Sequence, residues 1–468
     1  MINVTMVCSW SDKCRFKRMR PSPPSSLSSS SNWSELHSSI LESIFQRLSL
    51  QDVLTVQSVS SHWFSLSKTL ISSKSHAQSN QIPWLLMLNP PDDDQEHKQE
   101  IQDYKRVRQI DYKRHAAEFQ DQDHSRCTCI GSSHGWLIFL DHKASHPFLV
   151  NPFIQQVKIQ LPCLYSLLGI LKIEKIIDLG EYLIKYYNQA KNLDSYTTHL
   201  RQSVLYKSVL SSNPCLGVNN LGVVVIYGRT RKLGYCNYRD SSWRGLEEGK
   251  FCPYSDIICS NNNKLYALGE NACVETWDLL DGKCVPTKKM EIELCFPLKS
   301  AKILLSDSRY LYVRRLYLVE NLGDLLLVVR YIGEFVNGDN KAVHEDDLMN
   351  DGDTHPSVCP YKTLFFHVYK LDFDERRWIE VESLGDSALF LGGSHSVSVC
   401  SSVDSVYKKN SVYFTDDYWD RMEEDYLYGG HDMGVFSLED QSVEPIYQRH
   451  GGSMKIQPPP CWVAPSLW

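Results

Sequence analysis

The chain has 468 residues, of which 42% are apolar and 22% charged, and this length favours two or three domains. Its net charge of -7 excludes the basic excess that a nucleic-acid-binding protein usually carries. No run of residues matches a secretory signal or a membrane span, so we expect an intracellular, reduced protein with neither membrane nor nucleic acid as a partner.

Residues 1–31 form a basic, serine-rich leader. Their cationic side chains cluster between Lys13 and Arg20, and Asp12 is the one acidic residue. Such a segment has too little apolar surface to offset chain entropy, which predicts a disordered tail. The same composition is typical of an organelle transit peptide, and the basic cluster is compatible with nuclear import, so a targeting role stays open.

The sequence pattern of residues 32–71 predicts a module of three short helices. Apolar residues with a helical period define the first helix, for which Ser34 is the expected N-cap: Leu36, Ile40, Leu41, Ile44, Phe45 and Leu48. A second helix begins at Ser49–Asp52, and a third follows the turn at Ser58–Trp63 and ends near Leu70. So small a module buries little surface, so it either caps the next domain or lies against a partner.

The order of residues in this module resembles an F-box. The helix ending at Leu48, the Asp52-Val-Leu step, and then Val59 and Trp63 follow the family pattern. The sequence departs from it at His37, where the family usually has proline, and at Ser60, where many members have cysteine. The resemblance implies binding of a Skp-type adaptor in a cullin–RING ubiquitin ligase. The candidate adaptor-binding residues are Leu36, His37, Ile40, Leu41, Ile44, Leu48, Leu50, Asp52, Val59 and Trp63. Some of these ten must instead hold the helices together.

Residues 72–125 predict a polar linker, residues 126–450 an all-β domain and residues 451–468 a tail. In the β domain, a buried strand is repeatedly followed by a loop, an alternating strand and a polar turn, as in 134–140 with 148–153. Recurrence of a four-strand unit predicts a β-propeller, for which we expect about six blades. Residues 162–205 fit this pattern poorly and could hold an inserted helix.

Several motifs of the β domain resemble the plant domain of unknown function 295. They are Gly131–Leu137 with Leu149–Phe153, then Leu384–Gly392, and finally Asn410–Asp417 with Gly429–Phe436. The resemblance implies a kelch-like propeller in a plant F-box protein, a group whose best-understood members direct kinases to degradation. It implies a non-catalytic receptor that presents a target protein, with no cofactor and no metal.

Some residues of the β domain could carry chemistry instead. His431 and Asp432 follow Asp416 and Asp417 in the sequence, and His395 lies upstream, so a metal site or an acid–base pair is an alternative. Aspartates that cap glycine-containing turns explain the same pattern without any chemistry.

Aromatic residues around the acidic run 416–425 are candidate contacts for a target protein, since Tyr and Trp dominate interface energetics. They are Tyr413, Trp419, Tyr426 and Tyr428, although core packing is an equal explanation for Tyr413. The sequence therefore favours a substrate receptor of the nucleus or cytoplasm. An organelle-targeted protein and a metal-dependent propeller enzyme remain the alternatives.

Overall fold

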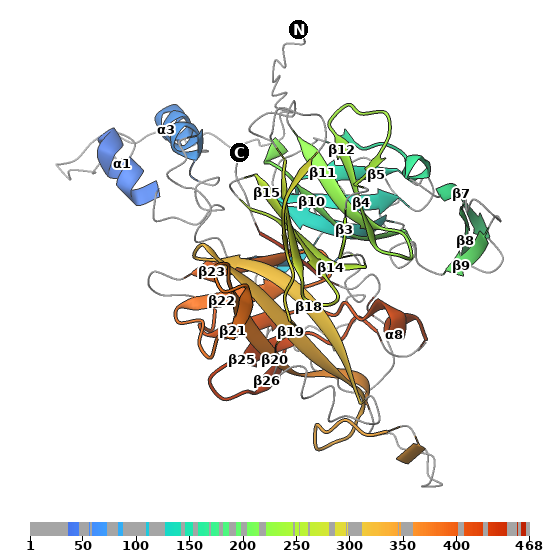
Figure 1. Ribbon diagram of the computed structural model, residues 1–468. Helices are drawn as coiled ribbons and strands as arrows, with labels where there is room; N and C mark the ends of the chain where they lie inside the picture. The colour runs from blue at the N-terminus through green and yellow to red at the C-terminus, as the bar shows by residue number, and fades with distance from the viewer. Residues whose placement is uncertain are drawn as a thin grey trace, which may run out of the picture.

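The computed structural model contains two neighbouring helices and a large assembly of β-sheets (Figure 1). None of the helices it describes has the length and apolar character needed to cross a bilayer. The structure describes residues 36–45, 56, 59–72, 83–87, 109–111, 127–141, 146–152, 158–167, 170–176, 181–186, 193–197, 204–214, 221–246, 249–251, 253–260, 263–279, 286–295, 297, 311–344, 346–347, 359–400, 407–424, 429–446, 456 and 460–464.

The first three blades of the propeller are four-stranded antiparallel sheets in which the strands follow chain order. Blade 1 consists of β3 (Cys127–Ser133), β4 (Trp136–Asp141), β5 (Pro147–Val150) and β6 (Lys158–Gln160). Blade 2 consists of β10 (Leu205–Leu210), β11 (Gly222–Tyr227), β12 (Lys232–Asn237) and β13 (Arg244–Gly245). Blade 3 consists of β14 (Tyr254–Cys259), β15 (Lys264–Gly269), β16 (Val274–Asp278) and β17 (Thr287–Ile292).

The last two blades have longer or reordered strands. Blade 4 consists of β18 (Tyr312–Asn321), β19 (Asp324–Val336), β20 (Cys359–Asp372) and β21 (Arg377–Glu380). In blade 5, β22 pairs in parallel with β24, so β23 takes the inner edge although it follows β22 in the chain. The strands of blade 5 are β22 (Ser387–Leu391), β23 (Ser396–Cys400), β24 (Ser411–Phe414), β25 (Gly434–Ser437) and β26 (Val443–Pro445).

The prediction of about six blades is wrong, since five of the described sheets have four or more strands. The space between blades 1 and 5 is filled by a smaller sheet of β1 (Trp84–Met87), β2 (Gln109–Asp111) and β27 (Cys461–Val463). These strands come from the segments predicted as linker and tail, and β1 pairs antiparallel with β27. Their short apolar runs are buried because one face packs on blade 1 and the other on blade 5.

The inner strands of the blades surround a common axis. β3, β10, β14 and β18 contact one another in that order, and β18 contacts β23. The circle closes where the N–H of Ser132 donates to the carbonyl of Ser394 at 2.9 Å. Blades approach closely there: a Cβ built on Gly131 would lie 2.2 Å from the carbonyl oxygen of Ser208, so this position in β3 requires glycine.

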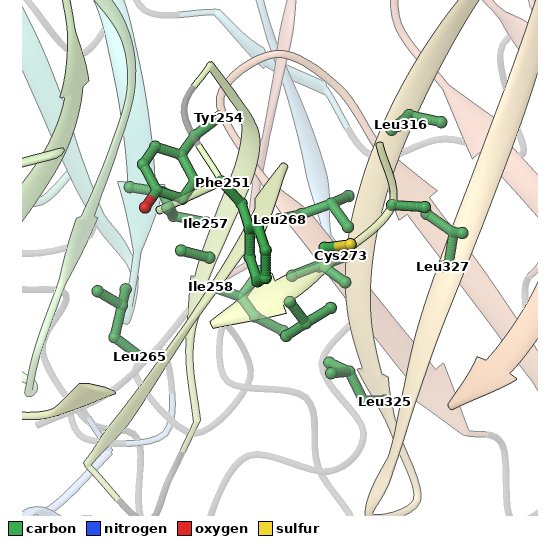
Figure 2. Packing of buried hydrophobic residues seen from close by; sticks show 14 of the residues in the cluster. Phe251, Tyr254, Ile257, Ile258, Leu265, Leu268, Cys273, Leu316, Leu325 and Leu327 are labelled. Carbon is green, nitrogen blue, oxygen red and sulfur yellow. The ribbon is translucent and has the colours of Figure 1, made fainter. Parts of the chain in front are cut away.

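Apolar side chains fill the space between adjacent blades. One cluster joins blades 2, 3 and 4, and Figure 2 shows part of it, with Ile258 and Cys273 of blade 3 near Leu325 and Leu327 of blade 4. A strand between two such clusters is buried on both faces. This explains why the runs at β4 and β11 are almost continuously apolar rather than alternating.

Two features lie outside the blades. Within residues 162–205, where a helix seemed possible from the sequence, the described residues include the short 3-10 helix η5 (Leu164–Ser166) and a separate antiparallel sheet, seen at the right of Figure 1. The strands of that sheet are β7 (Ile170–Ile176), β8 (Glu181–Tyr186) and β9 (Leu193–Thr197). The α-helices in the described part of the chain are α1 (Ser38–Phe45), α3 (Ser61–Ser72) and α8 (Trp419–Glu424), the last of which is in the β domain.

Candidate functional site

Helices α1 and α3 pack together through a small apolar core. Leu41 and Phe45 of α1 are fully buried, and the Phe45 ring meets that of Trp63 edge-on, with centroids 5.4 Å apart. Leu36 and Leu66 pack against the same cluster. Each buried Leu or Phe side chain contributes roughly 1.5–3 kcal/mol, so the described part of this pair has a core too small for much stability of its own.

The start of α1 shows how histidine replaces the expected proline. The carbonyl of His37 accepts the N–H of Leu41 at 3.2 Å, and its Nδ1 accepts the N–H of Ser39 at 3.4 Å. These are the bonds of an N-cap residue, which satisfies donors that the first turn leaves unpaired. His37 is therefore in the N-cap position of the described helix α1, and Ser34, the N-cap expected from the sequence, lies outside the described residues.

The second departure from the family pattern, Ser60, also has a local role. Its Oγ accepts the N–H of Trp63 at 3.2 Å and so caps the start of α3. A contact between the Oγ of Ser38 and the Nε2 of His62, at 3.1 Å, then ties the two helix starts together. A hydroxyl at position 60 thus orients the helix that carries Trp63.

Besides this core, the helix pair has apolar side chains that are exposed. Ile40 is 50% exposed and Ile44 38%, and their spacing of four residues places them on one face of α1. Val59, just before α3, is 55% exposed, and Phe64 of α3 is 48% exposed. Water contact with so much apolar surface is unfavourable, which marks this surface as a candidate interface.

The ten residues carried over from the family resemblance therefore separate into three groups. Leu41 is buried, and Leu36 and Trp63 are half-buried against it, so these three mainly hold the helices together. The exposed members are His37, Ile40, Ile44 and Val59. The remaining predictions fall outside the described residues: Leu48, Leu50 and Asp52. Sequence reasoning missed Phe64, although its place one residue after the inward-facing Trp63 turns it towards the outer face.

The aspartates considered as a metal or acid–base site belong to a buried ion-pair network. Arg330 of β19 is fully buried, and its Nη1 lies 3.0 Å from Oδ1 of Asp417, while its Nη2 lies 2.9 Å from Oδ2 of Asp432. The Nε of Arg330 donates to Thr363 at 2.7 Å, and the hydroxyl of Tyr317 donates to Asp417 at 2.9 Å. The network thus joins blades 4 and 5.

Asp416 extends this network without an ion pair of its own. Its Oδ2 accepts the hydroxyl of Tyr361 at 2.7 Å and the N–H of Asp432 at 3.2 Å. Burial, together with the nearby Asp432 charge, raises the pKa of Asp416. His431 lies beside the Tyr361 ring, with its Nε2 3.8 Å from Sγ of Cys359. Burial raises the pKa of the Cys359 thiol to about 11, which makes this cysteine a poor nucleophile.

His395 takes no part in that network. Its Nδ1 donates to the carbonyl of Ser132 at 2.5 Å, so it joins blade 5 to blade 1 near the axis. Burial lowers its pKa to about 4, so it is neutral at neutral pH. Among the described residues, no group of three or more His, Cys, Asp or Glu side chains could hold a metal ion. The carboxylates proposed for a metal are instead occupied by an arginine and by backbone or hydroxyl donors.

Of the aromatic residues proposed as target contacts, the structure describes two. Tyr413 is buried and stacks on Phe390 with ring centroids 4.6 Å apart, so it belongs to the core of blade 5. Trp419, at the start of α8, lines a cavity of about 240 Å³. Tyr426 and Tyr428 lie outside the described residues.

That cavity lies at the propeller axis and is lined by residues of blades 2 to 5. At its floor, Lys207 of β10 forms a buried ion pair with Asp256 of β14 and donates to the hydroxyl of Ser396 on β23 at 3.2 Å. Asp256 also accepts the N–H of Leu318 on β18 at 2.8 Å. Burial raises the pKa of Asp256, and Lys207 opposes this shift. The floor therefore joins four inner strands and is part of the scaffold.

The rest of the cavity lining is rich in arginine. Arg231 comes from the turn between β11 and β12, and Arg314 and Arg315 come from β18. Burial lowers the pKa of Arg314. Sequence reasoning identified none of these residues, because the strands that bring them together are far apart in the chain. This cavity and the exposed face of the helix pair are the two candidate functional sites.

Comparisons with known proteins agree with this architecture. The KIB1-4 beta-propeller family model matches residues 105–437, and the F-box domain model matches residues 33–74. Probable F-box protein At4g22060 of Arabidopsis thaliana is 25% identical, with 93% of this chain and 96% of the relative covered. The F-box/kelch-repeat protein KIB1 of the same plant is 23% identical, with 92% and 90% covered.

Solved structures are more distant. A streptogramin B lyase aligns with a TM-score of 0.20 and 8% identity over 62% of this chain and 87% of its own, a likeness too weak to carry any argument. The family model, by contrast, spans most of the chain and nearly all of the described blades, and the F-box model spans both α1 and α3. The chain therefore belongs to the KIB1-4 beta-propeller family, as a member with an N-terminal F-box domain.

Proposed function

We propose that this protein is a non-catalytic substrate receptor of a cullin–RING ubiquitin ligase of the SCF type. Its helix pair binds a Skp-type adaptor, and its propeller holds a target protein. The observation that carries the proposal is the apolar surface on an F-box helix pair whose own core is small: Ile40, Ile44, Val59 and Phe64. Burying these side chains against an adaptor groove would stabilise the pair as well as the complex.

The structure also gives a physical reason against the metal-dependent alternative. A metal site needs carboxylate or imidazole ligands that are available to the ion. Asp417 and Asp432 already bind Arg330, and Asp432 also accepts the N–H of Thr363 at 3.0 Å. A cation placed beside them would have to displace a guanidinium that is fully buried.

Co-purification with a Skp-type adaptor tests the proposal. We expect Ile44→Asp or Phe64→Asp in the full chain to reduce adaptor binding at least tenfold, because each places a charge in an apolar contact. The matched control is Met290→Asp, which introduces the same charge at a side chain of the propeller that is similarly exposed. Adaptor binding that is absent in the unmodified protein, or unchanged in both helix variants, would overturn the proposal.

A ligase receptor of this kind would work in the nucleus or cytoplasm, and we extend the proposal to that location. The leader, residues 1–31, lies outside the described residues. Sequencing the N-terminus of the protein from its natural cells tests this extension. A mature chain that begins near residue 30 would indicate processing of a transit peptide, and would favour an organelle instead.

A further inference from the structure

Two kinds of acidic residue lie in or beside the cavity at the propeller axis. Asp256 and Asp417 are in its lining but are buried and bound to partners of the scaffold, Lys207 and Arg330. Glu270 is also in the lining, and Asp420 follows the lining residue Trp419; they are 48% and 69% exposed at the side chain. They pair with Arg231 and Arg315, which we call the rim arginines. The first kind is needed for the fold, whereas the second kind only pairs with these two partly exposed cationic groups.

The rim arginines contact aromatic rings as well as these exposed acids. The guanidinium of Arg231 lies over the ring of Tyr206, 5.8 Å from its centroid, and that of Arg315 lies 5.3 Å from the centroid of Tyr418. Such contacts help to orient a guanidinium, whose planar fork of N–H donors matches the oxygens of a phosphoryl group. The Nε of Arg315 is buried and has no hydrogen-bond partner in the described part of the chain.

The pairs between these arginines and the exposed acids are weak and replaceable. Arg231 pairs with Glu270, and Nη2 of Arg315 lies 3.2 Å from Oδ2 of Asp420. Exposed ion pairs of this type contribute little net free energy, because solvent screens them and both side chains lose freedom. A group with two negative charges and several acceptor oxygens would compete well, since it can bind more than one guanidinium in a bidentate way.

We propose that this cavity recognises a phosphoryl group carried by the target protein, with Arg231 and Arg315 as the binding residues. The inference rests on the proposed function, because it names the chemistry by which the propeller selects its target. The two arginines come from different blades and line the same cavity of about 240 Å³. This volume is large enough for a phosphorylated side chain and exceeds what a single small ion needs. Trp419 at the edge offers an aromatic surface to the residues beside the phosphate.

The test uses the full chain and two synthetic peptide pools of degenerate sequence, one with a central phosphoserine and the other with serine. We expect the phosphorylated pool to be recovered at least tenfold better, with recovery that falls as salt is raised. Pyrophosphate, added as a competitor, distinguishes the two sources of the same group. Pyrophosphate binding without any preference among the peptides would mean that the ligand is a small phosphate compound, and it would overturn recognition of a phosphorylated target.

Variants with opposite expected effects make the test independent of folding. Arg231→Gln with Arg315→Gln should weaken recovery of the phosphorylated pool at least tenfold, whereas Arg377→Gln, on the outer strand β21, should not change it. Glu270→Gln with Asp420→Asn should strengthen recovery about threefold, because the competing carboxylates are gone. Equal recovery of both pools, or rim variants that behave as the control does, would overturn the inference.

This result can be separated from failure of the proposed function. Adaptor binding depends on Ile44 and Phe64, and it is measured on the same variants. If the rim variants keep adaptor binding while the phosphorylated pool shows no preference, the inference fails and the receptor proposal stands. If adaptor binding is absent while the phosphopeptide preference is present, the receptor proposal fails instead.

Discussion

Replacing Arg330 with methionine would remove the guanidinium that lies between the buried carboxylates of Asp417 and Asp432 at the junction of blades 4 and 5. Methionine has a similar length and fits an apolar space, so the main change is electrostatic. The carboxylate of Asp417 would keep the hydroxyl of Tyr317 at 2.9 Å, and that of Asp432 would keep the N–H and hydroxyl of Thr363 at 3.0 and 2.6 Å. Neither would keep a positive charge in contact.

Removing one member of a buried ion pair costs about 3–5 kcal/mol, because an uncompensated charge remains. The carboxylate left without a partner can become neutral by taking up a proton, so the free energy of that protonation is an upper limit to this cost. At pH 7, protonating an ordinary aspartic acid costs about 4 kcal/mol, and at pH 5 it costs about 1.5 kcal/mol. If one carboxylate is left uncompensated, the loss of stability in Arg330→Met should therefore be about 3–4 kcal/mol at pH 7 and at most about 1.5 kcal/mol at pH 5.

The assay is urea unfolding of the full chain, followed by tryptophan fluorescence, at both pH values. Arg377→Met is the matched control, since the Arg377 side chain is exposed and its Nε is 3.1 Å from the exposed Glu375. It should change the free energy of unfolding by less than about 0.5 kcal/mol. A loss below about 1 kcal/mol for Arg330→Met, or a loss that is equal at pH 5 and pH 7, would refute the electrostatic reasoning.

Three further predictions follow from the same structure. His395 and His134 both have a folded-state pKa of about 4, below the unfolded value of 6.5, so the stability they contribute is present above pH 6.5 and is lost as pH falls towards 4. His395→Asn should therefore reduce the pH dependence of the free energy of unfolding by up to about 3 kcal/mol. An unchanged pH profile would contradict this prediction. Trp462→Ala should cost about 3–5 kcal/mol in urea unfolding, because the ring is fully buried against blade 5. A cost below about 1 kcal/mol would mean that the sheet of β1 and β27 does not hold the propeller closed. Gly131→Ala should reduce soluble yield and thermal stability, since its Cβ would overlap the carbonyl of Ser208, and normal stability would show that β3 and β10 can separate there.

The helix pair shows most clearly which features could be predicted from the sequence. The spacing of apolar residues from Leu36 onwards correctly predicted a helix, and the ordered motif correctly identified an F-box. Spacing alone could not separate Leu41, which packs against α3, from Ile40, which faces outwards. Both lie within the same apolar pattern, and only the position of the second helix determines which side is inside.

In the β domain, the sequence by itself determined the architecture: apolar runs that recur with polar turns specify strands, and their recurrence specifies a propeller. The sheet that fills the space between blades 1 and 5 depended on the pairing of β1 with β27, which are more than 370 residues apart and carry no local signal of that pairing. The same holds for the aspartates, since Asp432 meets an arginine 102 residues away. Local periodicity reports which face of an element is buried. Contacts between distant elements are decided by how the blades pack, and so the ion-pair network and the arginine-lined cavity emerged only in the tertiary structure.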